Sequence, residues 1–420
     1  MKTSVVILNW NGRDFLKKYL PCLLDSLQGY DDVETVVADN ASTDGSRQLL
    51  AEEFPQVRLI QLSKNYGFAQ GYNLALRKLD SELFILLNSD VEVSPGWISP
   101  LLDWMEYHPE CGICAPLLHR TDQRDSFEYA GAAGGYLDRW CYPFCRGRVM
   151  DMLEKDEGQY SIPQEMLWVT GAALVVRSEV FKALKGFCGD FFAHMEEIDL
   201  CWRARIAGWR VNIVPRSVVY HVGGGSLSPD SPFKLFLNYR NNLLMMRRCL
   251  PYTYAVHKLY SLLGALTMPD EGPDLIQNCD YIFNVECDQF MRKQLVELAA
   301  ETASVKTEST IFIRMVLDGF AALVYLLSFR PKAFKAVIKA HREYRKISHK
   351  VEIVKIKQYL NRMMKDRGTE IPRVLLSQEC DNDNAGDDKF RFKGMWSKWI
   401  VAQRLIHSGD MFDNIKERIV

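Results

Sequence analysis

Short apolar runs alternate with longer stretches of helical apolar spacing over the first 225 residues. The runs are rich in Val, Ile and Leu, as in strands that are buried on both faces. Predicted strands are residues 4–8, 35–38, 57–62 and 83–87, and predicted helices are residues 15–28, a helix from about 44, and 68–79. This alternation predicts an α/β fold with a doubly wound, mostly parallel sheet.

The pattern changes twice further along the chain. Residues 103–164 are rich in Gly, Tyr and Arg and are predicted as loops, after which strands are expected at 168–170, 173–176 and 217–220. After residue 225 the spacing becomes helical and basic. We therefore expect an α/β domain over residues 1–228, a helical region over 229–376, and a polar linker and tail over 377–420.

Composition and charge exclude several protein classes. The 420 residues are 48% hydrophobic and 25% charged, which is ordinary for a globular protein and excludes a disordered or collagen-like chain. The 52 Lys and Arg nearly balance 53 Asp and Glu, so we expect no nucleic-acid partner. The 11 scattered cysteines favour reduced thiols over a zinc site at the Cys111/Cys114 pair. With no signal peptide and no clean membrane span expected, we predict a cytoplasmic protein.

Polar residues stand where the predicted strands end. Asn9, Asp39 and Asp90 each follow an apolar strand. In open α/β sheets, ligands bind beyond the carboxyl ends of the strands. A turn with a helix cap is the alternative interpretation of Asp39, and a plain turn is the alternative for Asp90.

Two further groups of residues carry possible chemistry. His221 follows the strand at 217–220 and precedes three glycines, although a lone His at a strand end is commonly a packing residue. Glu196, Glu197 and Asp199 begin a predicted helix, where acidic residues also complement the helix dipole. Asp199 has the spacing to pair with Arg203 instead.

Seven ordered stretches together resemble a known family. They are VVILNWNG, VVADNASTDGS, NYGFAQGYN, LLNSDVEVSPGW, VTGAALVVR, FFAHMEEIDLCWRARIAGW and VVYHVGGGS. Over about residues 3–250 the chain is similar to family 2 of the inverting glycosyltransferases, in its bacterial rhamnosyl- and galactofuranosyl-transferase-like branch. The resemblance implies the GT-A nucleotide-diphospho-sugar transferase fold with a helical C-terminal extension, its donor half at about 1–100 and its acceptor half at about 101–228.

The resemblance also implies a site for a UDP- or dTDP-sugar and a divalent metal. Asn88, Ser89 and Asp90 stand where the family has its Asp-x-Asp motif, so that Asp90, His221 and Asn88 would hold Mn²⁺ or Mg²⁺. Because Asn88 replaces an aspartate, the site has one negative charge fewer than the family pattern. The residues implied in donor binding are Asn9, Asn11, Asp39, Asn65, Gly67, Asn88 and Ser89.

Glu197 is the residue that the resemblance implies as general base, with Glu196 and Asp199 as alternatives. The implied reaction moves a sugar to a hydroxyl of a glycan or polyprenyl-linked acceptor in cell-surface polysaccharide synthesis. One alternative is a nucleotidyltransferase, which should carry a Gly-rich basic loop where this chain has Asn9-Trp10-Asn11-Gly12. The other is a non-catalytic scaffold for glycan assembly with a degenerate site, to which Asn88 points.

Two regions outside these motifs have predicted roles. The residues Glu128, Tyr129, Tyr136, Arg146 and Arg148 are predicted to form an acceptor-side loop, with a loosely ordered surface loop as the alternative. Residues 312–327 form an apolar face followed by a stretch, 331–367, with twelve Lys and Arg and three acidic residues. This combination predicts peripheral binding to an anionic membrane, at the inner face of the cytoplasmic membrane, with a buried core helix as the alternative.

Overall fold

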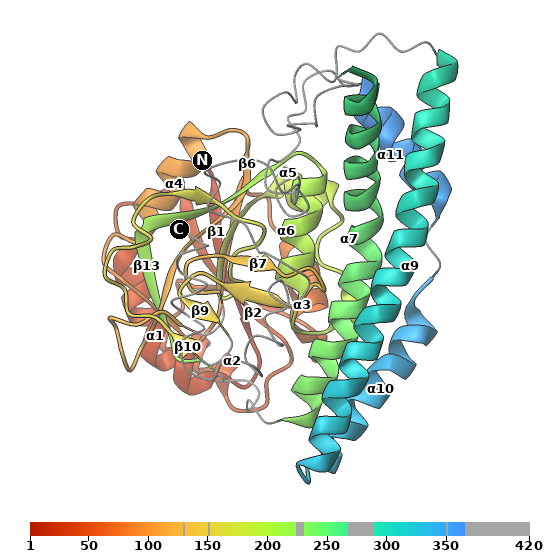
Figure 1. Cartoon of the computed structure of the whole chain (residues 1–420). Helices are drawn as coiled ribbons and strands as arrows, with labels where there is room; N and C mark the ends of the chain where they lie inside the picture. Colours follow the sequence, from red (N-terminus) through yellow and green to blue (C-terminus); the bar gives the residue numbers. More distant parts are fainter. Residues whose placement is uncertain (129–130, 150–151, 224–230, 268–288, 350–351, 366–420) are drawn as a thin grey trace. The chain divides into compact units, whose positions relative to one another are not determined.

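The structure is a computed structural model that describes residues 1–128, 131–149, 152–223, 231–267, 289–349 and 352–365 (Figure 1). The described chain divides into two compact units. The first contains Met1–Ala204 and Trp209–Ser231, and the second contains Arg205–Gly208 and the described residues from Pro232 onward. The predicted polar linker and tail at 377–420 lie outside the described residues.

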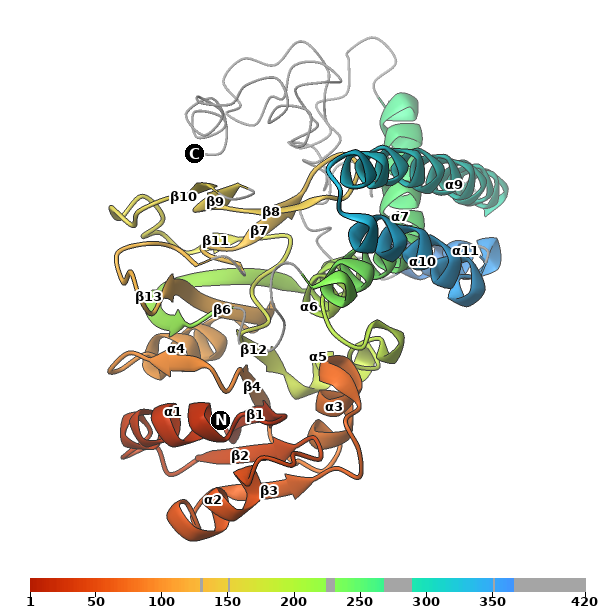
Figure 2. The same cartoon turned by 90° about the horizontal axis from the view of Figure 1, so that it is seen from below.

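The first unit is built on one mixed sheet with the strand order β11-β13-β6-β12-β4-β1-β2-β3, and β5 pairs with β13 (Figure 2). Strands β3, β2, β1 and β4 are parallel to one another, and β6 and β13 are parallel to each other. Because β12 is antiparallel to both β4 and β6, those two strands run in the same direction. The strands in the half that opens the chain are β1 (Thr3–Asn9), β2 (Val33–Asp39), β3 (Arg58–Gln61) and β4 (Leu83–Leu87).

Helices cover both faces of this sheet. Apolar residues of α1, α2 and α4 pack in one core cluster with Val5 and Ile7 of β1. On the opposite face, Gly71 of α3 lies against Leu8, and the Tyr72 hydroxyl donates to the carbonyl of Val6. The helices of this unit are α1 (Arg13–Ser26), α2 (Ser46–Glu53), α3 (Gly67–Leu76), α4 (Ile98–Tyr107), α5 (Ser178–Ala183) and α6 (Glu196–Ile206). The expected doubly wound, mostly parallel sheet is confirmed.

The prediction of loops over residues 103–164 was wrong in part. A ten-residue strand, β6 (Cys111–Arg120), lies within this region and is almost wholly buried. Pro116 concealed it, because proline cannot donate a ladder hydrogen bond and argues against a central strand. The strand tolerates Pro116 because its register with β13 shifts there, between Val214 and Val218.

The remaining strands complete the main sheet and form a small second one. The main sheet gains β5 (Val91–Val93), β11 (Gln164–Glu165), β12 (Ala173–Arg177) and β13 (Arg210–His221), and the antiparallel second sheet contains β7 (Gly135–Leu137), β8 (Pro143–Cys145), β9 (Arg148–Val149) and β10 (Met152–Leu153). Residues 168–170, predicted as a strand, contribute only an isolated bridge between Trp168 and Gly135. The short 3₁₀ turn Gly189–Phe191 precedes α6.

The second unit is helical, as expected. It contains α7 (Pro232–Thr267), α9 (Gln289–Leu327), α10 (Pro331–Ile347) and α11 (Ile353–Lys365), and α7, α9 and α10 pack against one another (Figure 1). Among the described residues, one helix, Phe290–Leu327, is long and apolar enough to cross a membrane by length and composition alone. No such span was expected from the sequence. Length and composition do not by themselves distinguish a membrane span from a core helix of a soluble protein.

Candidate active site

The carboxyl ends of β1 and β2 bring two predicted donor residues together. The parallel register places Asn9 opposite Asp39, and Asn9 Nδ2 donates to Asp39 Oδ1 over 3.3 Å. Both side chains are buried. Asn9 Oδ1 has no hydrogen-bond partner among the described residues, and a Cβ on Gly12 would come within 2.5 Å of it. Gly12 is therefore required for the chain to pass over Asn9.

A second layer of contacts fixes the loops that follow these strands. Ser42 Oγ accepts hydrogen bonds from Asn9 Nδ2 and from the Asn11 backbone, while Asn11 Oδ1 accepts one from the Thr43 backbone. Asp39 Oδ2 accepts from the Ser42 N–H over 3.1 Å. Asp39 thus closes a turn, as the alternative interpretation expected. The same contacts hold its carboxylate at the sheet edge.

Asn65 and Gly67 are linked to this edge of the sheet by Asn40, which was not among the predicted site residues. Asn40 Nδ2 donates to Asn65 Oδ1 and to the Gly67 carbonyl, over 3.1 and 3.0 Å. Gly67 has a φ of +74°, and a Cβ there would come within 2.5 Å of Phe192. The only sequence signal for Asn40 was its place directly after Asp39.

Asp90 and His221 meet because two strands pair. In the antiparallel register of β5 with β13, His221 lies opposite Val91, the residue after Asp90. As a result, His221 Nε2 lies 3.2 Å from Asp90 Oδ1. On the other side of the ring, Nδ1 lies 3.4 Å from Glu128 Oε2. Burial lowers the pKa of His221, but the Asp90 and Glu128 carboxylates outweigh burial and raise this pKa to about 10.

Glu128 was assigned to the acceptor-side loop, and the structure places it in the Asp90–His221 group instead. It is 3% exposed, and one of its oxygens would lie 2.8 Å from a Cβ on Gly223. No local pattern distinguished it, because its partners are about 90 residues distant in the sequence. Tyr129 lies outside the described residues.

The described residues contain no cluster of three His, Cys, Asp or Glu with the geometry of a formed metal site. The chemistry of the Asp90–His221 pair nevertheless fits a divalent cation, because carboxylate oxygen and imidazole nitrogen are ligands that Mn²⁺ accepts. Asn88 and Ser89 lie at the same strand end, where the Asn88 N–H donates to the Ala172 carbonyl.

Glu196 and Glu197 begin α6 after a strained loop. His194 and Met195 have φ values of 71° and 73°, in the left-handed region that residues other than glycine rarely adopt. Such strain is commonly found at functional sites. The loop is anchored to the donor side, because the Phe68 N–H donates to the Phe192 carbonyl over 2.6 Å.

The two glutamates have perturbed acidities. Burial raises the pKa of Glu197 to about 7. Burial, followed by the neighbouring Glu197 and Asp199 carboxyls, holds the pKa of Glu196 well above its usual range. Glu197 packs against Gly171, because a Cβ added to Gly171 would lie 3.2 Å from the Cβ of Glu197. The next residue, Ala172, accepts a hydrogen bond from the Asn88 N–H at the end of β4. Glu197 therefore lies beside the strand end that leads to Asp90.

Asp199 forms the predicted pair with Arg203 at 2.7 Å and has no exposed side-chain surface. Arg203 also donates to the carbonyls of Leu184 and Gly186. The pair therefore ties α6 to the segment that follows α5. This structural engagement distinguishes Asp199 from the two glutamates.

The other predicted acceptor-side residues are packed rather than loosely ordered. Arg146 is 4% exposed, donates to the Ala133 carbonyl and to Gln164, and lies over the Tyr160 ring. Tyr136 is buried in β7, and Arg148 begins β9. This region is a small sheet, with the buried Arg146 in the connection between β8 and β9.

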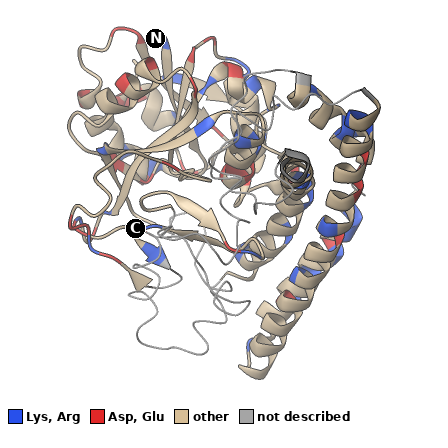
Figure 3. Cartoon of the chain, turned by 45° about the horizontal axis from the view of Figure 1, so that its top comes forward, with Lys and Arg blue, Asp and Glu red and all other residues tan. Residues whose placement is uncertain are grey.

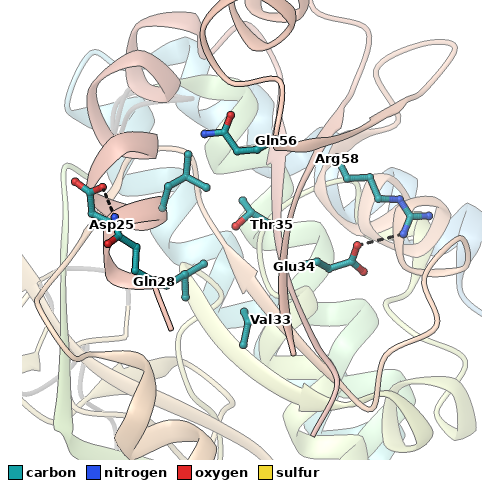
Figure 4. Close-up of a pocket in the computed structure, with 9 residues that line it drawn as sticks. Asp25, Gln28, Val33, Glu34, Thr35, Gln56 and Arg58 are labelled. Atoms are coloured by element: carbon teal, nitrogen blue, oxygen red, sulfur yellow. Dashed lines mark hydrogen bonds and ion pairs between the residues drawn. The ribbon is translucent and has the colours of Figure 1, made fainter. Parts of the chain in front are cut away.

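A surface pocket in the structure lies away from these residues (Figure 4). Its lining includes Val33 and Glu34, at the amino end of β2, and Arg58, at the start of β3. Glu34 and Arg58 form an ion pair of 3.3 Å across it. The pocket therefore lies at the amino ends of these strands, at the edge of the sheet opposite the candidate site. Parallel sheets bind their ligands at the carboxyl ends of the strands.

Comparison with known proteins agrees with the motif order. The family model described as "Glycosyl transferase family 2" matches residues 4–184. An N-acetylglucosaminyl-diphospho-decaprenol L-rhamnosyltransferase of Mycobacterium tuberculosis is 26% identical over 256 residues, which cover 58% of this chain and 83% of the relative. Rhamnosyltransferase WbbL of Escherichia coli K12 is 25% identical, over 52% of this chain and 82% of the relative.

Among solved structures, S. aureus TarS residues 1–349 in complex with UDP-GlcNAc aligns with a TM-score of 0.44 and 14% identity, over 82% of this chain and 92% of that one. The family match does not favour either alternative function, the nucleotidyltransferase or the non-catalytic scaffold. With its ordered motifs, the first unit of this chain has the GT-A fold on a doubly wound, mostly parallel sheet, and its residues 4–184 match glycosyl transferase family 2.

Proposed function

We propose that this glycosyltransferase moves a sugar, with inversion, from a UDP- or dTDP-sugar to a hydroxyl of a lipid-linked glycan in cell-surface polysaccharide synthesis. The observation that carries the proposal is the partly buried Glu197 carboxyl, with a pKa of about 7, beside the strand end that leads to Asp90 and His221. Two similar proteins are named as rhamnosyltransferases, one of them acting on a diphospho-decaprenol carrier. These names support the acceptor class.

Donor binding is assigned to the loops after β1, β2 and β3. The Asp39 carboxylate, oriented by Asn9 and by the Ser42 N–H, is an acceptor for the imide N–H of a uracil or thymine ring. Asn11 lies next to it through the shared Ser42 contact. Asn65 and Gly67 border the same edge through Asn40.

The metal is assigned to Asp90 and His221, with the Asn88 amide oxygen and the neighbouring Ser89 on the donor side. When bound, a divalent cation neutralises the charge of the departing diphosphate. Because Asn88 contributes no charge, Asp90 is the principal acidic ligand in this assignment. Burial of the Asp90–His221 pair excludes water that would compete for these groups.

Transfer then proceeds as one displacement. The acceptor oxygen forms a bond to the anomeric carbon from the face opposite the diphosphate, and the bond from that carbon to the diphosphate oxygen breaks. Glu197 takes the acceptor's hydroxyl proton, and the nucleoside diphosphate leaves. A carboxyl with a pKa near 7 is suited to this step, since a base works best near the ambient pH.

Glu197 is preferred over its neighbours because of their surroundings. Burial and the neighbouring Glu197 and Asp199 carboxyls hold the pKa of Glu196 well above its usual range, whereas the pKa of Glu197 is about 7. Asp199 is committed to Arg203. Glu197 is therefore assigned as the base, and Asp199 as a structural anchor.

Calorimetric titration of UDP, dTDP and GDP, each with and without Mn²⁺, tests the donor and metal assignments. Wild type should bind UDP or dTDP in a metal-dependent way, and Asp90→Ala should lose that dependence. Asp80→Ala is the matched control, because Asp80 is fully exposed at a distant turn. Metal-dependent binding that survives in Asp90→Ala would refute the metal assignment. No binding by wild type, in a sample that is folded by circular dichroism, would refute the donor site.

A further inference from the structure

The C-terminal half of α9 exposes large apolar side chains to solvent. Phe312 is 68% exposed, Phe320 62% and Leu327 70%. We call this surface the α9 apolar face, and it consists of Phe312, Ile313, Val316, Phe320, Leu323, Val324, Leu326, Leu327 and Phe329. Contiguous exposed apolar surface of this kind marks an interaction site.

The two charged residues within this stretch point inward. Arg314 and Asp318 are buried and form an ion pair of 2.9 Å, and His341 of α10 lies 3.4 Å from the same Asp318. Between residues 312 and 329, all of which are described, no charged side chain is exposed. Burial of Arg314 and Asp318 therefore leaves the exposed surface of residues 312–329 free of charge.

Phe329 strengthens the case that this surface is used. It follows the last turn of α9 with a φ of 57°, a conformation in which helices usually carry glycine. It is nonetheless 94% exposed, so no packing within the described chain compensates for the unfavourable backbone conformation. A phenylalanine in this position presents an aromatic ring at the end of the helix.

Basic residues follow the apolar face directly. Arg330, Lys332 and Lys335 are exposed at the turn into α10 and in its first turns, and Lys339 and Arg342 continue along that helix. In Figure 3 the helices of this unit carry more blue positions, Lys and Arg, than red ones. An apolar face with a basic flank matches an anionic lipid surface, whose headgroups attract the cations while its acyl region takes up the apolar side chains.

We propose that the α9 apolar face docks on an anionic bilayer, lying in the interface without spanning it. This inference deepens the proposed function, because it would hold the enzyme where a lipid-linked acceptor is found. A second copy of the chain is a poorer occupant, since self-association through this face would bring the basic flanks of the two copies together. A membrane instead supplies the complementary negative charge.

Flotation of the full-length protein with vesicles tests the proposal. Wild type should bind vesicles of phosphatidylcholine with phosphatidylglycerol and should bind pure phosphatidylcholine weakly. Phe320→Ser with Phe329→Gly should weaken binding at least tenfold, since each buried side chain of this size contributes roughly a tenfold change or more. Phe329→Gly by itself should leave the fold intact, because glycine suits the backbone there. The matched control replaces exposed apolar residues elsewhere, Tyr107→Ser with Ile162→Ser.

The charge contribution is tested separately. Lys332→Glu with Lys335→Glu should reduce binding to the anionic vesicles by roughly tenfold or more, since each basic residue near such a surface contributes about a fivefold change. Lys78→Glu with Lys182→Glu, exposed in the first unit, is the control of equal net charge. Equal binding by the face variant and its control would overturn the proposal. The proposal would also be overturned if wild type did not bind vesicles but formed a concentration-dependent dimer that the face variant did not form.

The test is independent of catalysis. Glu197→Gln should bind vesicles as wild type does, even where it transfers no sugar. Loss of sugar transfer with intact vesicle binding would therefore indicate a defect in the active site and not in the membrane surface. Loss of vesicle binding in the face variant, with unchanged nucleotide binding, would support the membrane surface alone.

Discussion

Replacing Glu197 by glutamine should abolish sugar transfer and, at the same time, stabilise the protein in a pH-dependent way. Glutamine keeps the shape of the side chain but can neither take a proton nor carry a charge. Loss of a general base reduces the rate by about 10²–10⁴-fold. The gain in stability arises because the buried carboxylate is costly when it is ionised.

The magnitude follows from the acidity of the side chain. The folded pKa of Glu197 is about 7, against an ordinary value of 4.5. Below pH 4.5 both folded and unfolded states are protonated, so that Glu197 does not affect the free energy of unfolding. As the pH rises from 4.5 to 7, the unfolded state ionises first and stability is lost. Linkage gives a cost of below about 1 kcal/mol at pH 5 and about 3 kcal/mol at pH 8, which Glu197→Gln removes.

Urea denaturation of the wild type and the variant at pH 5 and pH 8, without donor or metal, measures this difference. Glu179→Gln, at an exposed position in the first turn of α5, is the control and should change stability by only a few tenths of a kcal/mol, roughly equally at both pH values. The transfer rate of wild type should rise with pH through about 7.

Two results would contradict this reasoning. One is a stability difference between Glu197→Gln and wild type that is the same at both pH values, since this would mean that Glu197 has an ordinary acidity. The other is a large loss of transfer in Glu196→Gln with activity retained in Glu197→Gln, which would reverse the two assigned roles. We expect Glu196→Gln to keep most of the activity, because Glu196 is not assigned the proton transfer.

Three further outcomes are expected. Glu128→Ala should weaken Mn²⁺ binding by about 10–100-fold in calorimetry, because Glu128 orients the His221 ring, and Glu128→Gln should lose less; equal affinity in all three proteins would exclude this role. Gly67→Ala should destabilise the protein by at least about 1 kcal/mol in thermal melts, since its φ is +74° and its Cβ would collide with the loop before α6. Asp318→Ala should cost about 3–5 kcal/mol in urea denaturation by leaving Arg314 buried without its partner, and a cost below 1 kcal/mol would show that water replaces the carboxylate.

Local pattern was sufficient for the first half of the sheet. The strands that end at Asn9, Asp39 and Leu87 each contain a run of apolar residues, and the helices between them have a regular apolar spacing. Since parallel strands present their carboxyl ends at one edge, the common position of Asn9 and Asp39, which we propose bind the donor, followed from the strand order. The Asp199–Arg203 pair was also predictable, because residues four apart share a helix face.

The hydrophobic pattern did not predict strand β6, because this strand contains a proline. Strand β6 carries Pro116, which the sequence rules exclude from a central strand. The register shift in β13 that accommodates this proline is formed by residues about 100 positions later. No window of sequence contains both halves of that arrangement.

The sequence by itself determined the fold class, the family and the chemical types at the strand ends, because these depend on short-range periodicity and on ordered motifs. Only the tertiary structure decided that Glu128 contacts His221, that Asn40 links Asn65 to Gly67, and that Asp318 of α9 is buried beside His341 of α10. Each of these is a contact between segments far apart in the chain. Such contacts depend on how strands pair and helices pack, which residue spacing does not encode.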